Sequence, residues 1–371
     1  MAHVRKQCIT FFLTAKCNLN CRYCYARKNI KRLKIKPEHQ TLNFNFAKRG
    51  LQDFFRDYPS RHIRFYGVGE PTIEFELMKK IKDYAYELAG EKLIVELQTN
   101  GYFSEKIREW IAKNVDILWL SIDGPPEIQD MHRPTLEGKA SSKIVEKNLK
   151  FFAKQKHMQV GVRSTVSSFT IRRQIEIVEY FAKMGIKYVN AHPACVPIGG
   201  DSDPIFQWEP IEFAKEFLKA HNRAQELGVF YNSLYIANFD EKTRYACRAC
   251  IPYPQLTTDG YVSCCDFATF GPKYMSASLQ QLVYGKYIQE EDRIVYDEEK
   301  IFKIRSRCAE NLEKGPCKNC KFVYYCAGGC LGQIVNETGN IMGIHKKNCK
   351  ITKYLAERME LGKGLWPVLH S

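Results

Sequence analysis

Three cysteines in a short stretch near the N-terminus constrain this chain more than any other feature. Cys17, Cys21 and Cys24 form the pattern C-x3-C-x2-C within the stretch from Lys16 to Tyr25. This spacing is too tight for three separate structural elements and suits one loop that wraps around a metal centre. A cubane iron–sulfur cluster takes four ligands, normally all cysteine, so a loop with three thiolates leaves one iron for a ligand from outside the protein. A zinc loop or a set of unrelated thiols is the alternative.

The cysteine count of the whole chain indicates reduced thiols rather than disulfide bonds. The chain has 371 residues and 15 cysteines, an odd number that is too small for a disulfide-dense scaffold of this length. The N-terminal residues show no secretion signal, and no apolar run approaches the roughly 20 residues of a membrane helix. We therefore expect a cytoplasmic protein that binds metal through its cysteines and does not associate with a membrane.

Composition and charge describe a basic globular protein. A hydrophobic content of 45% and a charged content of 26% are ordinary values, and the length suffices for one large α/β domain and a smaller one. The formal charge is +15, from 56 Lys and Arg against 41 Asp and Glu. A basic surface attracts nucleic acid or an acidic peptide. The densest basic run extends from Arg27 to Lys36, and we interpret it as a solvated loop or strand edge.

Apolar, β-rich runs alternate with helical patterns through the first two hundred residues. This alternation predicts a parallel sheet with crossover helices. The predicted strands are Cys8–Thr14, His62–Tyr66, Leu93–Thr99, Ile117–Ile122, Gln159–Val166 and Tyr188–His192. The predicted helices lie near Asn45–Phe55, Glu76–Leu88, Glu105–Ala112, Lys143–Phe152, Arg172–Met184 and Ile211–Leu227. Six such units fit a partial (β/α)6 barrel, and in a parallel barrel the chemistry sits at the carboxyl ends of the strands.

Glycine-rich and polar segments follow several of the predicted strands. Tyr66–Thr72, with the sequence Y-G-V-G-E-P-T, follows the second strand. Its two glycines let the backbone approach a ligand closely, and its Glu-Pro pair adds a fixed turn. Gln98–Gly101 (Q-T-N-G) and Ser121–Pro126 (S-I-D-G-P-P) follow the next two strands and have the composition of turns. Arg163 lies in the fifth strand, where a surface ion pair is the alternative to a ligand contact.

The cysteine loop resembles that of the radical S-adenosylmethionine (SAM) superfamily, C-x3-C-x-aromatic-C, with Tyr23 as the aromatic residue. In that family the open iron chelates the amino and carboxylate groups of SAM. The G-V-G-E-P segment is similar to the family's G-G-E-P segment, which receives the SAM amino group largely through its backbone, although Val68 replaces the second residue. The resemblance implies a [4Fe-4S] cluster on the three cysteines and a radical SAM barrel. The residues that it implies for SAM binding are Tyr23, Gly67, Gly69, Glu70, Ser121 and Arg163.

A second group of cysteines fills the C-terminal third of the chain. The segment Val196–Pro210 concentrates Pro, Gly and Asp and ends the regular alternation, either as a domain boundary or as an active-site loop. Ten of the fifteen cysteines then lie between Cys247 and Cys349. The T-D-G-Y sequence around Gly260 predicts a tight hairpin that brings two thiolates to one cluster. A pair of zinc ribbons is the alternative for this region.

The intervals C-x9-G-x4-C and C-x2-C-x5-C-x3-C in this region resemble the SPASM domain, an auxiliary-cluster module of radical SAM enzymes that act on peptides and proteins. The resemblance implies two further [4Fe-4S] clusters. It divides the chain into a radical SAM core at 1–230, a SPASM domain at 231–350, and a C-terminal helix and tail at 351–371. The implied ligands are Cys247, Cys250, Cys265 and Cys330 for an inner cluster and Cys317, Cys320, Cys326 and Cys349 for an outer cluster. Cys247 lies outside the minimal pattern, so whether Cys247 or Cys264 completes the inner set stays open.

The family resemblance implies that SAM is cleaved reductively and that the resulting 5′-deoxyadenosyl radical removes a hydrogen atom from a peptide or protein side chain. Two fully ligated auxiliary clusters suit an oxidative outcome, namely formylglycine formation, dehydrogenation or cross-linking. Asp266 directly follows Cys265. In sulfatase-maturing relatives an aspartate at this position acts as the base, and capping of a turn is the alternative role.

The resemblance also implies partners, which are a peptide or protein substrate and an electron donor such as flavodoxin or ferredoxin. Only sixteen residues precede Cys17. This leaves no room there for a winged-helix leader-binding domain, so a separate leader-binding protein is a further candidate. An RNA- or small-molecule-modifying enzyme and a non-enzymatic iron–sulfur electron carrier are the alternative functions. Because the C-terminal module is of the peptide type, we do not expect nucleic acid as the substrate.

Overall fold

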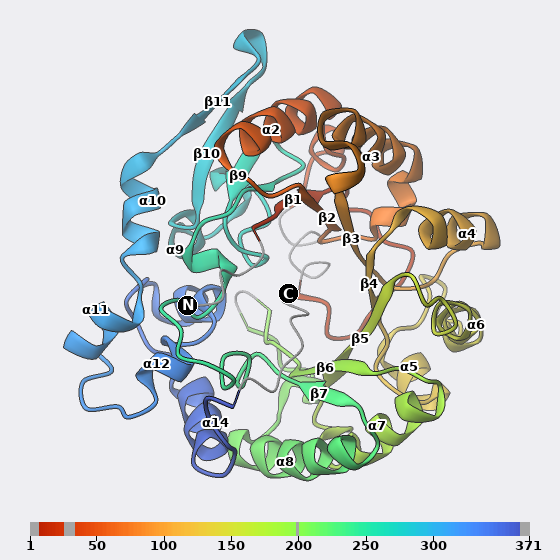
Figure 1. The fold of residues 1–371 in the computed structure, drawn as a ribbon, viewed down its shortest axis with the longest axis vertical. Helices are drawn as coiled ribbons and strands as arrows, with labels where there is room; N and C mark the ends of the chain where they lie inside the picture. The colour runs from red at the N-terminus through yellow and green to blue at the C-terminus, as the bar shows by residue number, and fades with distance from the viewer. Residues whose placement is uncertain (1–6, 26–33, 198–199, 364–371) are drawn as a thin grey trace.

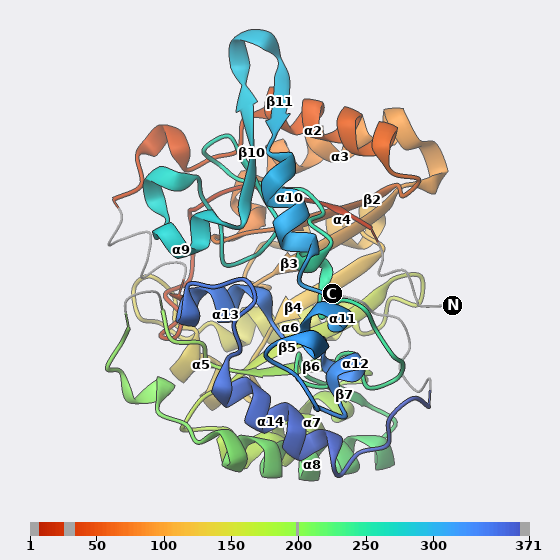
Figure 2. The same cartoon turned by 90° about the vertical axis from the view of Figure 1, so that its left-hand side faces the viewer.

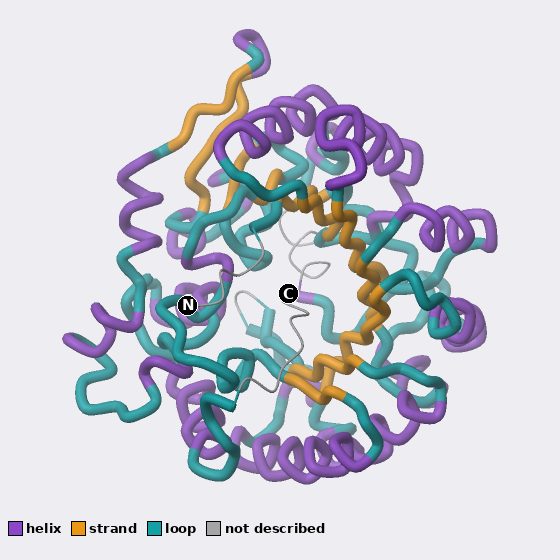
Figure 3. Tube along the Cα trace, in the orientation of Figure 1, coloured by secondary structure: helices purple, strands orange, loops and turns teal. Residues whose placement is uncertain are grey.

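The computed structural model describes residues 7–25, 34–197 and 200–363. Most of the basic run that begins at Arg27 lies outside the described residues, as does the end of the predicted C-terminal tail. The fold is a curved sheet with helices on its outer side (Figures 1 and 3). Two parts of different topology share this sheet, and they correspond to the two cysteine regions of the sequence.

The first part is a parallel sheet in which each strand pairs with the next one along the chain. This order, with a crossover helix after almost every strand, is that of a partial barrel. The strands are β1 (Ile9–Phe12), β2 (His62–Tyr66), β3 (Ile94–Thr99), β4 (Ile117–Ser121), β5 (Gln159–Val166), β6 (Tyr188–Pro193) and β7 (Phe230–Asn232). The helices are α2 (Phe44–Asp57), α3 (Phe75–Ala89), α4 (Glu105–Asn114), α5 (Pro126–His132), α6 (Ser142–Phe152), α7 (Gln174–Lys183) and α8 (Pro210–Glu226).

Local sequence explains where these helices begin and which face they bury. Asn43 caps α2, since its side chain accepts hydrogen bonds from the backbone N–H groups of Asn45 (2.8 Å) and Phe46 (3.1 Å). Phe46, Gly50 and Phe54 recur at helical spacing and are buried against the sheet. The predicted helices of the first two hundred residues are thus confirmed, with ends that differ by at most two residues.

The second part extends the same sheet beyond β1. β8 (Gln255–Leu256) pairs with β1 in parallel, and β9 (Tyr261–Ser263), β10 (Val283–Ile288) and β11 (Arg293–Tyr296) continue it antiparallel. Gly260 lies in the β8–β9 turn at φ 86°, a left-handed conformation that favours glycine. The predicted T-D-G-Y hairpin is therefore confirmed. The β10–β11 hairpin projects beyond the rest of the molecule (Figure 2).

Six short helices complete the C-terminal region. They are α9 (Ala277–Gln280), α10 (Glu298–Arg305), α11 (Ala309–Lys314), α12 (Val323–Cys326), α13 (Leu331–Thr338) and α14 (Lys346–Ala356). α14 packs against α8 of the barrel. One continuous hydrophobic core runs through both parts, from Ile9 on β1 to Leu355 on α14. The two topologies therefore share one sheet and one core, and the predicted boundary near residue 230 falls within β7 of the parallel part.

Two elements of the barrel differ from the predicted pattern. α5 lies where two successive prolines, Pro125 and Pro126, were interpreted as a turn, because proline fits the first turn of a helix as well as it fits a turn. β7 adds a seventh parallel strand at the edge of the sheet. It has only three residues, too few for an alternating pattern to be recognised. Within the described ranges, the structure contains no helix that is both long enough and apolar enough to span a membrane.

Replacement of Leu256 on β8 tests how firmly the two parts are joined. Leu256 is completely buried and pairs with Phe11 of β1. We expect Leu256→Ala to lower the free energy of unfolding by about 2–5 kcal/mol, because it leaves a cavity at the junction. The measurement is urea unfolding followed by circular dichroism. Phe302→Ala on α10 is the control, because Phe302 is 76% exposed and its truncation should change stability by less than about 0.5 kcal/mol. An equal loss of unfolding free energy in Leu256→Ala and Phe302→Ala would show that the junction between the two parts is not tightly packed.

Candidate functional site

A cavity of about 400 Å³ opens at the carboxyl ends of the barrel strands. The loop after β1 contributes Cys17, Cys21 and Cys24, and the C-terminal region contributes Cys247, Cys264, Cys265 and Cys330. Every residue predicted to bind SAM lines the same cavity: Tyr23, Gly67, Gly69, Glu70, Ser121 and Arg163. The parallel register explains this convergence, since the carboxyl ends of neighbouring strands meet at one rim.

The G-V-G-E-P segment lies directly on the cysteine loop. The N–H of Gly69 donates to the carbonyl of Thr14 (3.1 Å), and the N–H of Glu70 donates to that of Lys16 (2.8 Å). A Cβ atom on Gly69 would lie 2.0 Å from the Lys16 carbonyl oxygen, so this close approach requires glycine. Val68, the residue that departs from the family pattern, is buried and lines the cavity beside the two glycines.

The buried Glu70 carboxylate joins this segment to the end of β3. It accepts hydrogen bonds from the backbone N–H and hydroxyl of Thr72 (3.1 and 2.7 Å), the hydroxyl of Thr99 (2.6 Å) and the backbone N–H of Asn100 (2.7 Å). Burial raises the pKa of Glu70, although these hydrogen bonds act in the opposite direction. The amide of Asn100 in turn lies 3.8 Å from Cys17 Sγ. Glu70 therefore positions the wall of the cavity next to the first cysteine.

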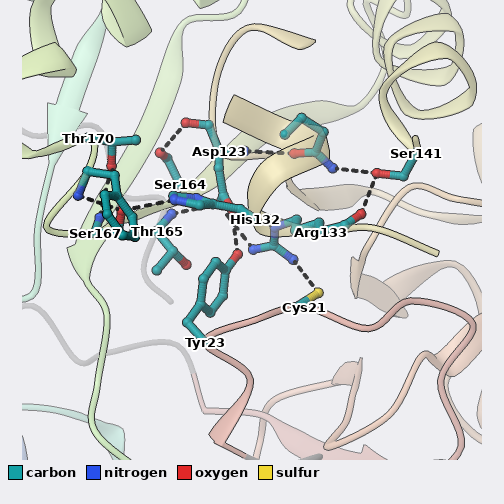
Figure 4. A network of polar contacts seen from close by, with 12 residues as sticks. Cys21, Tyr23, Asp123, His132, Arg133, Ser141, Ser164, Thr165, Ser167 and Thr170 are labelled. Atoms are coloured by element: carbon teal, nitrogen blue, oxygen red, sulfur yellow. Dashed lines mark hydrogen bonds and ion pairs between the residues drawn. The ribbon is translucent and has the colours of Figure 1, made fainter. Parts of the chain in front are cut away.

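A buried carboxylate, Asp123, holds the cysteine loop from the other side (Figure 4). It accepts hydrogen bonds from the Tyr23 hydroxyl (2.6 Å), Arg133 Nε (3.0 Å) and the backbone N–H of Thr165 (2.8 Å). His132 Nδ1 lies 3.1 Å from the same carboxylate. Burial acts to raise the pKa of Asp123, but Arg133 and His132 outweigh it and hold that pKa well below its usual range. Asp123 is therefore an anion fixed by four neighbours.

This network reaches the cysteines themselves. Arg133 Nη1 lies 3.9 Å from Cys21 Sγ. The backbone N–H groups of Asn20 and Arg22 donate to the carbonyls of Pro134 (2.8 Å) and His132 (2.9 Å). The end of α5 and the residues after it therefore support the cysteine loop in two ways. They accept its backbone hydrogen bonds, and they connect it to the Asp123 network.

Asp266 stands on the opposite wall of the cavity, at the end of the β8–β9 hairpin. Arg64 Nη2 lies 3.4 Å from Oδ2 of Asp266. The hydroxyl of Tyr25 donates to the backbone carbonyl of Asp266 (3.0 Å), and the Tyr25 ring stacks on Phe267 at 5.1 Å. Oδ1 of Asp266 is buried and has no hydrogen-bond partner among the described residues. One carboxylate oxygen is thus held by Arg64, and the other has an unused acceptor site.

Arg64 links Asp266 to a group of charges inside the barrel. Its Nε atom lies 3.6 Å from Glu96 Oε1, and His62 Nε2 lies 3.1 Å from Glu96 Oε2. Burial acts to raise the pKa of Glu96, but His62, Arg248 and Arg64 lower it to about 2. A carboxylate that stays ionised inside the barrel fixes the guanidinium of Arg64 in place.

The cysteines predicted for the outer cluster, Cys317, Cys320, Cys326 and Cys349, line a second cavity of about 150 Å³ next to the first. Cys247 and Cys330 lie in the wall between the two cavities and line both. Cys250 is buried beside Cys247. The structure brings each predicted set together, and it leaves Cys264 in the wall of the main cavity next to Cys265.

All fifteen cysteines lie in the described residues, and none of them forms a disulfide bond there. Burial raises the pKa of Cys21, Cys326 and Cys330 to about 12, so these thiols keep their protons until a cation replaces them. Thiolates that converge on cavities are the donors that iron–sulfur clusters use, so the residues fit such groups. Among the described residues, no three His, Cys, Asp or Glu side chains lie close enough to bind a single metal ion.

Comparison with known proteins decides the family. A model of the radical SAM superfamily matches residues 11–199. The chain belongs to the radical SAM superfamily. It is therefore an enzyme of a class that uses a [4Fe-4S] cluster and SAM, and the predicted radical SAM barrel is confirmed.

The most similar relatives of this radical SAM enzyme include proteins that modify other proteins. It is 24% identical over 337 residues to a cysteine-type anaerobic sulfatase-maturating enzyme of Clostridium perfringens, with 85% of each chain covered. An uncharacterised protein of Methanocaldococcus jannaschii, MJ0907, is 32% identical over 181 residues, which are 48% of this chain and 59% of that protein.

Two solved structures share the fold over nearly the whole chain. Native anSMEcpe with bound AdoMet and Cp18Cys peptide superposes with a TM-score of 0.71 at 18% identity, covering 94% of this chain and 97% of the other. Streptococcus suis SuiB bound to precursor peptide SuiA superposes with a TM-score of 0.63 at 16% identity, covering 94% and 77%. The likeness includes the cysteine-rich C-terminal region, so the predicted architecture of barrel and SPASM-type region is confirmed.

Several residues of this radical SAM site were not predicted from the sequence. Asp123 lies inside the S-I-D-G-P-P segment, where only Ser121 is predicted as a site residue, and its partner Arg133 directly follows α5. The signal for Asp123 was a carboxylate immediately after a buried strand, which costs free energy unless a cation pairs with it. Arg64 gave no signal, because an arginine within a strand has many uses and its partner Asp266 lies 202 residues away.

His192 is not among the residues predicted for the site, but it lies in the walls of both cavities. The backbone N–H of Leu234 donates to His192 Nδ1 (3.2 Å), so this nitrogen is an acceptor and the proton of the ring is on Nε2. Burial, together with the nearby Arg163, lowers the pKa of His192 to about 3. The ring is therefore neutral at physiological pH and can donate one hydrogen bond from Nε2.

Asp123→Asn tests the network that supports the cysteine loop of this radical SAM barrel. We expect it to lower the free energy of unfolding by about 3–5 kcal/mol, because it leaves the Arg133 guanidinium buried without its counter-charge. The measurement is urea unfolding at pH 7. Asp203→Asn is the matched control, because the ion pair between Asp203 and Arg22 is partly exposed and should contribute less than about 1 kcal/mol. Similar losses in the two variants would show that the Asp123 network is not the main support.

Proposed function

We propose that this radical SAM enzyme oxidises a side chain of a peptide or protein substrate by formylglycine formation, dehydrogenation or cross-linking. The observation that carries the proposal is the composition of the main cavity. Three cysteines of the barrel, the predicted SAM contacts and the predicted inner-cluster cysteines face one space, together with Asp266. A site with this composition suits removal of a hydrogen atom followed by removal of an electron and a proton from the same substrate.

In this proposal Cys17, Cys21 and Cys24 hold the cluster that binds SAM, which supplies a 5′-deoxyadenosyl radical when it is cleaved by one electron. The residues around it provide placement. Tyr23 is fixed by its hydrogen bond to Asp123, and Gly69 presents backbone atoms that a larger residue would displace. Burial of the surrounding side chains excludes water that would otherwise consume a reactive intermediate.

Asp266 would accept the proton that the substrate loses. Its Oδ1 is buried and has no hydrogen-bond partner among the described residues, whereas Oδ2 is held by Arg64. Because Tyr25 holds the backbone of Asp266, the open oxygen has a fixed direction. A positioned carboxylate of this kind is suited to general base catalysis.

The remaining predicted cysteines would hold two auxiliary clusters, which would supply an acceptor for the electron that accompanies this proton. Cys247, Cys250, Cys265 and Cys330 would hold the inner one beside Asp266, and Cys317, Cys320, Cys326 and Cys349 the outer one. Cys247 and Cys330 lie in the wall that separates the two cavities, so the two predicted cysteine sets are neighbours. Free thiols and an electron donor such as flavodoxin or ferredoxin suit a reducing compartment, which is the cytoplasm in this proposal.

The substrate in this proposal is a peptide or a protein segment. The two structural neighbours were solved with peptides bound, Cp18Cys in anSMEcpe and SuiA in SuiB. The cavity of about 400 Å³ is lined by both apolar and polar side chains, as ligand sites commonly are. A separate leader-binding protein remains part of the proposal for substrates that carry a leader.

Anaerobic incubation with SAM, a reductant and a candidate peptide tests this function. We expect release of 5′-deoxyadenosine together with either a loss of two hydrogens from the peptide or conversion of Cys or Ser to an aldehyde, read by mass spectrometry. Iron and sulfide analysis of the reconstituted protein is the accompanying measurement. A protein that holds about two zinc ions and no labile sulfide would contradict the proposal, because zinc neither donates nor accepts an electron.

Asp266→Asn tests the base. We expect normal iron content and normal release of 5′-deoxyadenosine but a loss of modified peptide of roughly 100-fold or more, because the proton has no acceptor. Mass spectrometry of the peptide and chromatography of the nucleoside give the two readouts. Asp292→Asn, on the exposed tip of the β10–β11 hairpin, is the control and should behave as wild type. Unchanged product formation by Asp266→Asn would remove Asp266 from the mechanism.

A further inference from the structure

The part of the chain that carries the outer cysteines is unusually rich in lysine. Residues 314–353 contain seven lysines and one acidic residue, Glu337, whereas the whole chain has 56 basic and 41 acidic residues. Glu337 lies 3.0 Å from His345 Nε2. The seven lysines, here called the lysine collar, are Lys314, Lys318 and Lys321 around α11 and α12, and Lys346, Lys347, Lys350 and Lys353 on α14.

The collar surrounds the second cavity. Lys353 lines that cavity together with Cys317, Cys320 and Cys349. Lys318 and Lys321 flank Cys320 in the sequence, and Lys346 and Lys350 lie on either side of Cys349 along α14. Both views of the fold place α14 beside α12 (Figures 1 and 2). The two lysine-bearing segments therefore meet at the outer cysteines.

The charges of the collar are available to a partner. All seven lysines are exposed, and in the described ranges none of them forms an ion pair with a carboxylate. By contrast, lysines on the barrel helices such as Lys79, Lys150 and Lys219 pair with glutamates three or four residues away. Unpaired like charges repel one another. An acidic partner that covers such a surface relieves this repulsion, which favours binding of that partner.

The outer cysteines are also more accessible than the inner ones. All four cysteines of the outer set are half-buried, whereas two of the four in the inner set, Cys250 and Cys265, are buried. Proteins that exchange electrons approach one another through small, transient interfaces, and complementary charge brings them together. The collar thus places positive charge around four cysteines that are all partly exposed.

We propose that the lysine collar is the docking surface for a small acidic electron-transfer protein that carries a flavin or an iron–sulfur cluster. This inference rests on the proposed function, because it assigns a partner to the outer cysteines. RNA fits the surface less well. Lys321 Nζ lies 4.9 Å above the ring of Phe322, which is buried, so this ring offers no stacking platform for a base.

Binding measurements on the anaerobically reconstituted protein test the collar. The probe is a bacterial flavodoxin, and its affinity is measured by biolayer interferometry between about 20 and 200 mM salt, a range in which screening changes strongly. We expect Lys318→Glu combined with Lys346→Glu to weaken binding by roughly tenfold at low salt and to reduce the salt dependence. Lys346 lies in the first turn of α14, where glutamate favours the helix, so folding should be retained.

A charge-matched variant controls for the overall charge of the protein. Lys113→Glu combined with Lys156→Glu changes two exposed lysines on the opposite side of the barrel, near α4 and α6 (Figure 1), and should keep the wild-type affinity. Equal weakening in the two double variants would overturn the proposal, and so would loss of binding to a single-stranded RNA oligonucleotide with flavodoxin binding unchanged.

Two further measurements separate the docking surface from the proposed function. Iron content and 5′-deoxyadenosine release driven by a chemical reductant should be the same in the collar variant and in wild type. If they are the same and flavodoxin binds the collar variant as well as wild type, the docking proposal fails while the proposed function stands. If wild type itself releases no 5′-deoxyadenosine, the proposed function fails, and the binding data alone then decide whether the collar recognises an acidic protein.

Discussion

The buried charge of Asp123 is the interaction on which the site of this radical SAM enzyme depends. A carboxylate inside the barrel is costly unless cations and donors surround it. Asp123 meets this requirement through its contacts with Tyr23, His132 and Arg133, which come from two segments that are distant in sequence. Since Tyr23 belongs to the cysteine loop and Arg133 contacts Cys21, the same charge that must be compensated also fixes the geometry of the loop. The groups that compensate the buried charge of Asp123 therefore also hold the cysteines in place.

Asp266 follows the same physical rule with a different result. Its partner Arg64 is itself held by the ionised Glu96, so a row of alternating charges extends from the interior of the barrel to the cavity. The row ends at an oxygen that has no partner among the described residues. Asp123 has every acceptor satisfied and is suited to a structural role, whereas Asp266 keeps one acceptor open and is suited to chemistry. The contrast between the two carboxylates follows from their hydrogen bonds and not from their residue type.

Much of the fold could be predicted because its signals are local. The strand and helix patterns from Ile9 to Pro193, the hairpin at Gly260 and the grouping of the cysteines depend on residues that are close in sequence. The missing parts depend on contacts between distant residues. The pairing of β8 with β1, the ion pair of Arg64 with Asp266 and the role of Asp123 leave no periodic trace in the sequence. β7 and α5 were missed for a different reason, since three residues and a pair of prolines are ambiguous by themselves.

The parallel pairing of β8 with β1 has a consequence for biosynthesis. β1 leaves the ribosome before the other strands of this sheet, but Leu256, which pairs with Phe11, follows roughly 250 residues later, about 10 to 50 s at ordinary rates of translation. During that time the outer edge of β1 has unpaired N–H and C=O groups, and the cysteine loop that follows it has only half of its cavity. An open edge of this kind is prone to aggregation. The nascent chain therefore has a vulnerable interval that ends only when β8 of the second cysteine region has been made.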